Sequence, residues 1–96
     1  MNEKQLNPKE LMISRYEAFV NEDWEYIAQT SVYQTLEELQ DSPSMDWLKL
    51  EVINAYDDIV EFKAYYKENQ KTYVLHEKSK FIKENNRWKY LDGELF

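Results

Sequence analysis

The sequence predicts an α+β fold in which N-terminal helices pack on a curved antiparallel sheet of about four strands. Residues 8–39 carry helix-start signals and apolar residues spaced three and four apart, whereas residues 47–91 alternate between apolar and polar side chains. Helices followed by an antiparallel meander are typical of a domain with its helices on one sheet face. A chain of 96 residues can enclose one core, so residues 1–96 are predicted to form a single domain.

The first helix is predicted to run from residue 8 to about Val20. Asn7 suits the N-cap position, Pro8 suits the first turn, and Glu10 completes a capping box three residues after the cap. The helix then carries a broad apolar arc made of Leu11, Met12, Tyr16, Phe19 and Val20.

Two further helical segments are expected before the strands begin. Asp23 can cap a short helix over residues 24–29. Thr30 or Ser31 is expected to cap a third helical turn, which includes Val32, Tyr33, Leu36 and Leu39. The Asp-Ser-Pro-Ser segment at residues 41–44 has the composition of a loop and divides the helical half from the strands.

Four strands are predicted at residues 47–56, 59–66, 70–83 and 87–91. Asn85 and Asn86 are expected to form the last tight turn, because asparagine tolerates positive φ. The apolar sides of the first two strands are predicted to present Leu48, Leu50, Val52, Val60, Phe62, Ala64 and Tyr66. Long strands of this kind twist, and twisting around the first helix would leave a cavity between helix and sheet.

Arg15 is the most informative residue, because it lies on the apolar helix face between Leu11 and Phe19. One alternative is that its stem lies along the core while the guanidinium reaches solvent. The other is an inward pairing with Glu77 or Asp92, the two carboxylates expected on the apolar sides of the last two strands. Such a pair would brace the helix on the sheet, and it could also line a pocket.

The inward polar groups and the aromatic residues beside them define the predicted site. We expect the ligand-binding residues to be Arg15, Tyr16, Glu77, Ser79, Trp88, Tyr90 and Asp92. No catalytic residue is predicted, since no nucleophile lies in a recognisable pattern with a base. An acid/base pair of Glu77 and Asp92 is the alternative.

No metal or cofactor site is predicted. The chain has no cysteine, and its one histidine, His76, is expected on the outer sheet face. Gly93 is the only glycine, so a glycine-rich phosphate loop is excluded. Gly93 is instead expected to permit a turn after the fourth strand.

The charge distribution argues against nucleic-acid binding. The net charge is −7, and all of it lies in residues 1–46, which hold ten acidic and three basic groups against nine of each in residues 47–96. No signal peptide and no apolar run of roughly 18 residues is visible, so no membrane contact is expected and a cytoplasmic location is the default.

The outer sheet face is expected to carry the basic residues of the last hairpin, Lys78, Lys80, Arg87 and Lys89. These charges would keep an exposed sheet from pairing with neighbours. The alternative is a docking surface for a partner or a homodimer through the sheet, to which three aromatic residues expected to be exposed could contribute: Trp24, Trp47 and Tyr65.

Two terminal motifs resemble the middle domain of YchJ-like bacterial proteins. The first is Leu11-Met12-x-Ser14-Arg15-Tyr16-x-Ala18-Phe19-Val20. The second is His76-Glu77-x-Ser79-x-Phe81-x-x-Glu84-Asn85-x-x-Trp88-x-Tyr90-x-Asp92-Gly93. Trp47-Leu48-x-Leu50 also stands where the family has a similar segment, and the resemblance covers residues 8–93. Ile13 replaces an arginine and Asn86 replaces a glycine of the family pattern.

The resemblance implies a nuclear transport factor 2-like cone and an uncharacterised bacterial family. Its usual members flank this domain with cysteine-rich, zinc-binding SEC-C segments, and a chain without cysteine carries neither, so zinc is not carried over. The preferred interpretation is a non-enzymatic module that binds an unknown small ligand or a protein. The alternative is a small hydrolase, isomerase or dehydratase using Glu77 or Asp92, for which fold analogy alone is a weak warrant.

Overall fold

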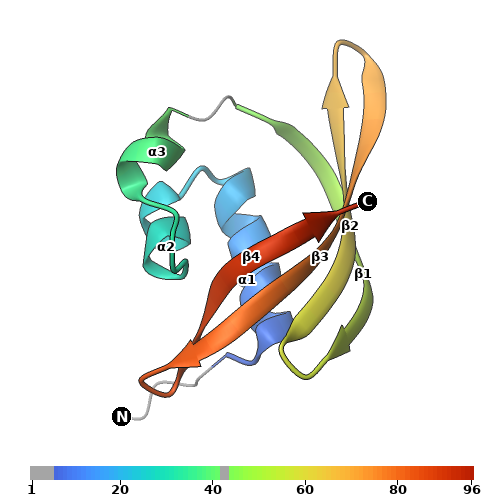
Figure 1. Ribbon diagram of the computed structural model, residues 1–96. Helices are drawn as coiled ribbons and strands as arrows, with labels where there is room; N and C mark the ends of the chain where they lie inside the picture. The colour runs from blue at the N-terminus through green and yellow to red at the C-terminus, as the bar shows by residue number, and fades with distance from the viewer. Residues whose placement is uncertain (1–5, 42–43) are drawn as a thin grey trace.

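The computed structural model describes residues 6–41 and 44–96, and in them the chain forms three helices followed by four strands (Figure 1). The helices are α1 (Pro8–Val20), α2 (Trp24–Gln29) and α3 (Leu36–Gln40). The strands are β1 (Asp46–Tyr56), β2 (Ile59–Glu68), β3 (Lys71–Glu84) and β4 (Arg87–Leu95), and they form one antiparallel sheet in chain order. All three helices lie on one side of this sheet, so the predicted α+β class is confirmed.

Helix α1 begins as its sequence predicts. The Asn7 side chain accepts a hydrogen bond from the Glu10 backbone N–H at 2.8 Å, and the Glu10 side chain accepts one from the Asn7 N–H at 3.2 Å. This reciprocal capping box satisfies two N–H groups that have no partner within the helix. The inward face of α1 buries Leu11, Met12, Arg15 and Ala18.

The third helix differs from its prediction, because it begins at Leu36 rather than near Ser31. Thr35 is its N-cap and accepts a hydrogen bond from the Glu38 N–H at 3.3 Å. Residues 30–32 instead pair with β4: the Val32 N–H donates to the Tyr90 carbonyl at 2.9 Å, and the Tyr90 N–H donates to the Thr30 carbonyl at 2.7 Å. Backbone groups used in this short parallel bridge are not available to a helix. Of the predicted loop at 41–44, residues 42–43 lie outside the described part of the chain.

The hairpin turns explain how long strands reverse with so little glycine. Asn85 and Asn86 have φ of 50° and 65°, so the predicted turn between β3 and β4 is confirmed. Asn69 and Gln70, at 51° and 67°, make the equivalent turn between β2 and β3. Two consecutive residues at positive φ match the right-handed twist of the flanking strands.

The main core lies between α1 and the sheet. Val60, Phe62 and Ala64 of β2 and Phe81 of β3 are buried there against Leu11 and Met12 of α1. The alternation predicted for β2 is therefore confirmed. A second, smaller cluster joins the helices to one another through Ala18, Ile27 and Leu39.

Strand β1 departs from simple alternation at Leu48. The register with β2 shifts between Trp47 and Lys49, leaving Leu48 exposed and turning Trp47 toward the core. Leu50 and Val52 face the core as predicted, whereas the predictions for Leu48 and Trp47 are wrong. An extra residue in one strand changes the face on which its neighbours lie.

A register shift at Leu91 in β4 has a larger effect. Phe81 is opposite Tyr90, but Lys80 is opposite Asp92, so Leu91 is an additional residue. Asp92 thereby shares the outer face with exposed Lys80, and Gly93 comes to the inner face opposite buried Ser79. The strand continues to Leu95, and the predicted turn at Gly93 is wrong.

No helix in the described ranges is long and apolar enough to cross a membrane.

Candidate functional site

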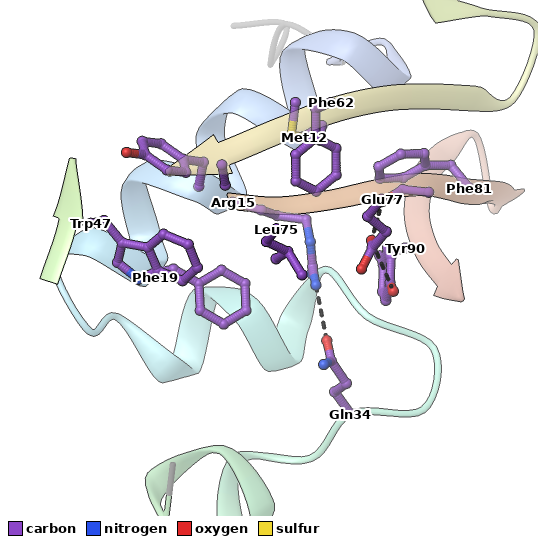
Figure 2. Close-up of a pocket in the computed structure, with 13 residues that line it drawn as sticks. Met12, Arg15, Phe19, Gln34, Trp47, Phe62, Leu75, Glu77, Phe81 and Tyr90 are labelled. Carbon is purple, nitrogen blue, oxygen red and sulfur yellow. Dashed lines mark hydrogen bonds between the residues drawn. The ribbon is translucent and has the colours of Figure 1, made fainter. Parts of the chain in front are cut away.

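A cavity of about 190 Å³ lies between helix α1 and the inner face of the sheet. Five of the seven predicted ligand-binding residues line it: Arg15, Tyr16, Glu77, Ser79 and Tyr90. Figure 2 shows Arg15 of α1, Glu77 of β3 and Tyr90 of β4 converging, with Gln34 approaching from the segment before α3. The structure therefore brings residues distant in the chain into one cavity.

Arg15 is buried, with 5% of its surface exposed, so its guanidinium does not reach solvent. Its Nη1 donates to the Ile27 carbonyl at 3.0 Å, to Thr30 Oγ1 at 2.7 Å and to Ser31 Oγ at 2.8 Å. Its Nη2 donates to Gln34 Oε1 at 2.9 Å, as the dashed line in Figure 2 shows. All four acceptors are uncharged oxygens.

These contacts place a positive charge at the carboxyl end of α2. The last carbonyls of a helix lack partners within it and carry partial negative charge. Helix α2 has no basic residue in its own last turn. Arg15 supplies that charge from α1, so it ties the two helices together, and the predicted pairing with Glu77 or Asp92 is not made.

The environment of Arg15 changes its acidity but leaves it positive at neutral pH. Burial lowers the pKa of Arg15 to about 10, while the nearby Tyr90, Tyr26 and Glu77 act in the opposite direction. Its guanidinium carbon lies 4.6 Å from the centroid of the Tyr90 ring. A guanidinium over an aromatic face is attracted by the negative face of the ring.

Glu77 is the carboxylate of the cavity, and one of its oxygens is held in place. Oε2 accepts hydrogen bonds from Ser79 Oγ and from the Tyr90 hydroxyl, the latter at 3.4 Å. A Cβ added to Gly93 would lie 2.5 Å from Glu77 Cδ and 2.8 Å from the Tyr90 hydroxyl oxygen. The absence of a side chain on Gly93 therefore makes the space that this carboxylate occupies.

Tyr90 connects the two charged residues. Its ring lies beside the Arg15 guanidinium, and its hydroxyl donates to Glu77. Burial, followed by the charge of Glu77, raises the pKa of Tyr90 to about 12, so the phenol stays protonated and remains a donor. The ring also packs edge-on against Phe81.

Two predicted site residues do not line the cavity. Asp92 is exposed on the outer face because of the additional residue Leu91. Trp88 is half-buried against the main core, and Lys83 Nζ lies 5.9 Å from its ring centroid. The predicted network of Arg15, Glu77 and Asp92 is therefore replaced by one of Arg15, Tyr90 and Glu77.

The sequence interpretation also missed several lining residues, of which Trp47 and Gln34 are the most informative. Trp47 was expected to be exposed, but it packs edge-on against Tyr16 at 5.9 Å and Tyr66 at 5.6 Å between ring centroids. Its place beside Leu48 and Leu50 in a family-like segment was the available signal. Gln34 had none, since it lies in an irregular segment. Trp24, also expected to be exposed, is half-buried against Phe19.

The described residues contain no group of three or more histidine, cysteine, aspartate or glutamate side chains arranged to hold a metal ion. His76 lies opposite Lys63 on the outer face, where its Nε2 is 2.7 Å from Glu61 Oε2.

Helices on one face of an open antiparallel sheet, with a cavity between them, define an NTF2-like α+β domain. The chain belongs to the YchJ-like family: residues 7–93 match the family described as "YchJ, middle NTF2-like domain". The fold and family expected from the two terminal motifs are therefore confirmed.

Two curated proteins that are similar to this chain are UPF0225 proteins. The chain is 41% identical over 101 residues to a UPF0225 protein of Shewanella sp. (strain MR-4), covering 91% of this chain and 62% of that protein. It is 38% identical over 97 residues to a UPF0225 protein of Vibrio parahaemolyticus, covering 90% of this chain and 58% of that protein. The chain thus spans about three fifths of the length of these curated relatives.

A solved structure has the same fold. The solution structure of a SEC-C motif containing protein from Rhodopseudomonas palustris matches with a TM-score of 0.76 and 28% identity. The match covers 93% of this chain and 78% of that one.

Proposed function

We propose that this domain binds a small organic molecule in the cavity between α1 and the sheet. The observation that carries the proposal is an apolar cavity in which one carboxylate is held by fixed donors. Apolar walls with a few placed polar groups are the usual composition of a ligand site.

The size of the cavity limits the ligand. An apolar cavity of roughly 150 Å³ is able to hold benzene, whereas drug-sized ligands occupy about 300–1,000 Å³. At about 190 Å³, this cavity suits a molecule of the size of a substituted benzene ring.

The polar groups of the site are preorganised. Ser79 and Tyr90 fix one oxygen of Glu77, and the α2–α3 segment fixes Arg15. Side chains that are ordered before binding do not lose that freedom when a ligand arrives, which favours affinity.

The position of Asp92 favours binding over the enzymatic alternative. An acid/base mechanism using both predicted carboxylates needs both near the substrate. Asp92 lies on the outer face and Glu77 on the inner face, so the two do not share the cavity.

A cavity-filling variant tests the proposal. Ala64 is 2% exposed and lines the cavity, whereas Ala55 lies exposed in β1. Benzene-sized fragments would be screened by two-dimensional NMR against the native domain, Ala64→Leu and the control Ala55→Leu. We expect fragments that shift the Trp47 indole signal to bind the native domain and Ala55→Leu alike, and Ala64→Leu at least tenfold more weakly. The proposal fails if no fragment shifts cavity signals, or if Ala64→Leu binds as the native domain does.

A further inference from the structure

The carboxylate of Glu77 has one oxygen without a protein partner. Both donors that hold this side chain, the hydroxyls of Ser79 and Tyr90, bond to Oε2. Within residues 6–41 and 44–96, no donor bonds to Oε1, and neither His76–Glu61 nor Lys89–Glu84 involves Glu77. No buried side-chain oxygen in these ranges lacks a hydrogen-bond partner, so the unpartnered Oε1 is accessible to solvent. It is therefore open to a donor that a ligand brings.

Arg15 lines the same cavity, but it does not donate a hydrogen bond to Glu77. Its Nη1 and Nη2 donate to uncharged oxygens of the α2–α3 segment, directed away from Glu77, as Figure 2 shows for the contact with Gln34. The Tyr90 ring lies beside its guanidinium. The positive charge thus has its own partners, and the negative charge lacks a partner at contact distance.

The wall of the cavity on the α1 and β1 side is aromatic. Tyr16 and Trp47 meet edge to face with ring centroids 5.9 Å apart. Phe19 also lines the cavity, and Figure 2 shows its ring beside that of Trp47. Aromatic rings attract cations through their faces, tryptophan most strongly, and the attraction grows when the cation is desolvated. These rings also provide an apolar surface for the body of a ligand.

We infer that the ligand is a small organic cation, a primary ammonium group on an apolar body of about the size of a benzene ring. The inference rests on the small-ligand binding proposed above. The ammonium group donates to Glu77 Oε1, and the body packs among Tyr16, Phe19 and Trp47. A charge-assisted hydrogen bond of this kind is about twice as strong as a neutral one. An anionic ligand would instead bring a second negative charge against Glu77.

Three probes of one shape test the inference on the native domain. Benzylamine, benzyl alcohol and benzoate would be titrated at neutral pH and followed by two-dimensional NMR. We expect benzylamine, as the ammonium ion, to bind about tenfold more tightly than benzyl alcohol, with benzoate the weakest. Equal binding of benzylamine and benzyl alcohol, or preference for benzoate, would overturn the inference of a cationic ligand. The proposal of small-ligand binding would remain.

A pair of isosteric variants assigns the preference to Glu77. Glu77→Gln keeps the shape and removes the charge, and we expect it to bind benzylamine and benzyl alcohol equally. Glu94→Gln, on the exposed outer face of β4 opposite Lys78, should keep the native preference. Loss of the preference in Glu94→Gln to the same extent would contradict a site at Glu77. If none of the three probes binds, the inference of a cationic ligand is overturned. The fragment screen with Ala64→Leu would then test the proposed function separately.

Discussion

The two charged residues of the cavity, Arg15 and Glu77, are held in contrasting ways. Arg15 is 5% exposed and donates to four acceptors on one segment of the chain. Glu77 is half-buried, receives two hydroxyl hydrogen bonds on one oxygen and keeps the other oxygen free. A charge whose donors are occupied by its own protein stabilises the fold, whereas a charge with spare capacity is available to a ligand. We therefore call the part of the cavity at Arg15 its structural end and the part at Glu77 its recognition end.

Replacing Arg15 should have the largest effect on folding. Arg15→Met keeps an apolar stem but removes the charged donor of the Ile27 carbonyl and of the Thr30 and Ser31 hydroxyls. Hydrogen bonds to charged groups are worth about 1.5–3 kcal/mol each, and the Ile27 carbonyl keeps the Ser31 hydroxyl as a donor. We therefore expect the free energy of unfolding to fall by about 3 kcal/mol in urea denaturation. Lys9→Met, exposed on the same helix, is the control. A loss below about 1 kcal/mol would contradict the structural role of Arg15.

Gly93→Ala should affect Glu77 more than it affects the fold. The new Cβ would meet the carboxylate end of Glu77, a flexible group that can rotate away. We expect about 1–2 kcal/mol of destabilisation together with loss of the benzylamine preference.

A double-mutant cycle with Glu77→Ala sharpens that test of Gly93. Removing the carboxylate first removes the clash with it, so the two effects should be coupled by about 1 kcal/mol. Strict additivity would show that Gly93 serves another purpose.

Ser79→Ala should have a smaller effect, confined to the recognition end. Ser79 is 2% exposed and donates to Glu77 Oε2. We expect a stability loss of about 1 kcal/mol, weaker benzylamine binding, and unchanged NMR signals for Thr30 and Ser31. Changed signals at those two residues would mean that the two ends of the cavity are not independent.

Tyr90→Phe should have the smallest effect at neutral pH, because the ring beside Arg15 remains and only a 3.4 Å hydrogen bond is lost. The cost should be below about 1 kcal/mol. In the native domain the pKa of Tyr90 is raised from 10.0 to about 12. Its contribution to stability is therefore fully present below pH 10 and is lost as the pH rises through about 12.

Phenolate absorbance measures this Tyr90 prediction. The native domain should show one more late-ionising phenol than Tyr90→Phe, titrating near pH 12. An identical titration of both proteins would contradict the burial of this hydroxyl beside Glu77.

The elements governed by local chemistry could be predicted from the sequence. The capping box of Asn7 and Glu10 fixed the start of α1, and the positive φ of Asn85 and Asn86 made the last hairpin. The alternation of Val60, Phe62 and Ala64 gave the inner face of β2. Each signal lies within a few neighbouring residues, which is why it could be read without the fold.

The errors arise where one additional residue changes the side on which a strand presents its side chains. Leu91 moved Asp92 out of the predicted site and brought Gly93 into it. Near Leu48, the same effect turned Trp47 inward. Such register shifts depend on pairing with the neighbouring strand, so alternation within one strand does not reveal them. The partners of Arg15 were missed for a related reason, since they lie at the end of α2 and in the irregular segment that follows it, and tertiary contacts bring both to Arg15.

The parallel bridge between Ser31 and Tyr90 has a consequence for local opening. The Val32 and Tyr90 N–H groups are held across two segments far apart in the chain, at 2.9 and 2.7 Å. Neither can exchange its hydrogen with solvent unless the α2–α3 segment and the edge of β4 separate. Because Arg15 is anchored to the same segment and lies over the Tyr90 ring, that separation would also move its guanidinium away from the ring. The two amides and Arg15 should therefore belong to one unit that opens cooperatively. We expect the Val32 and Tyr90 amides to exchange with solvent at similar rates.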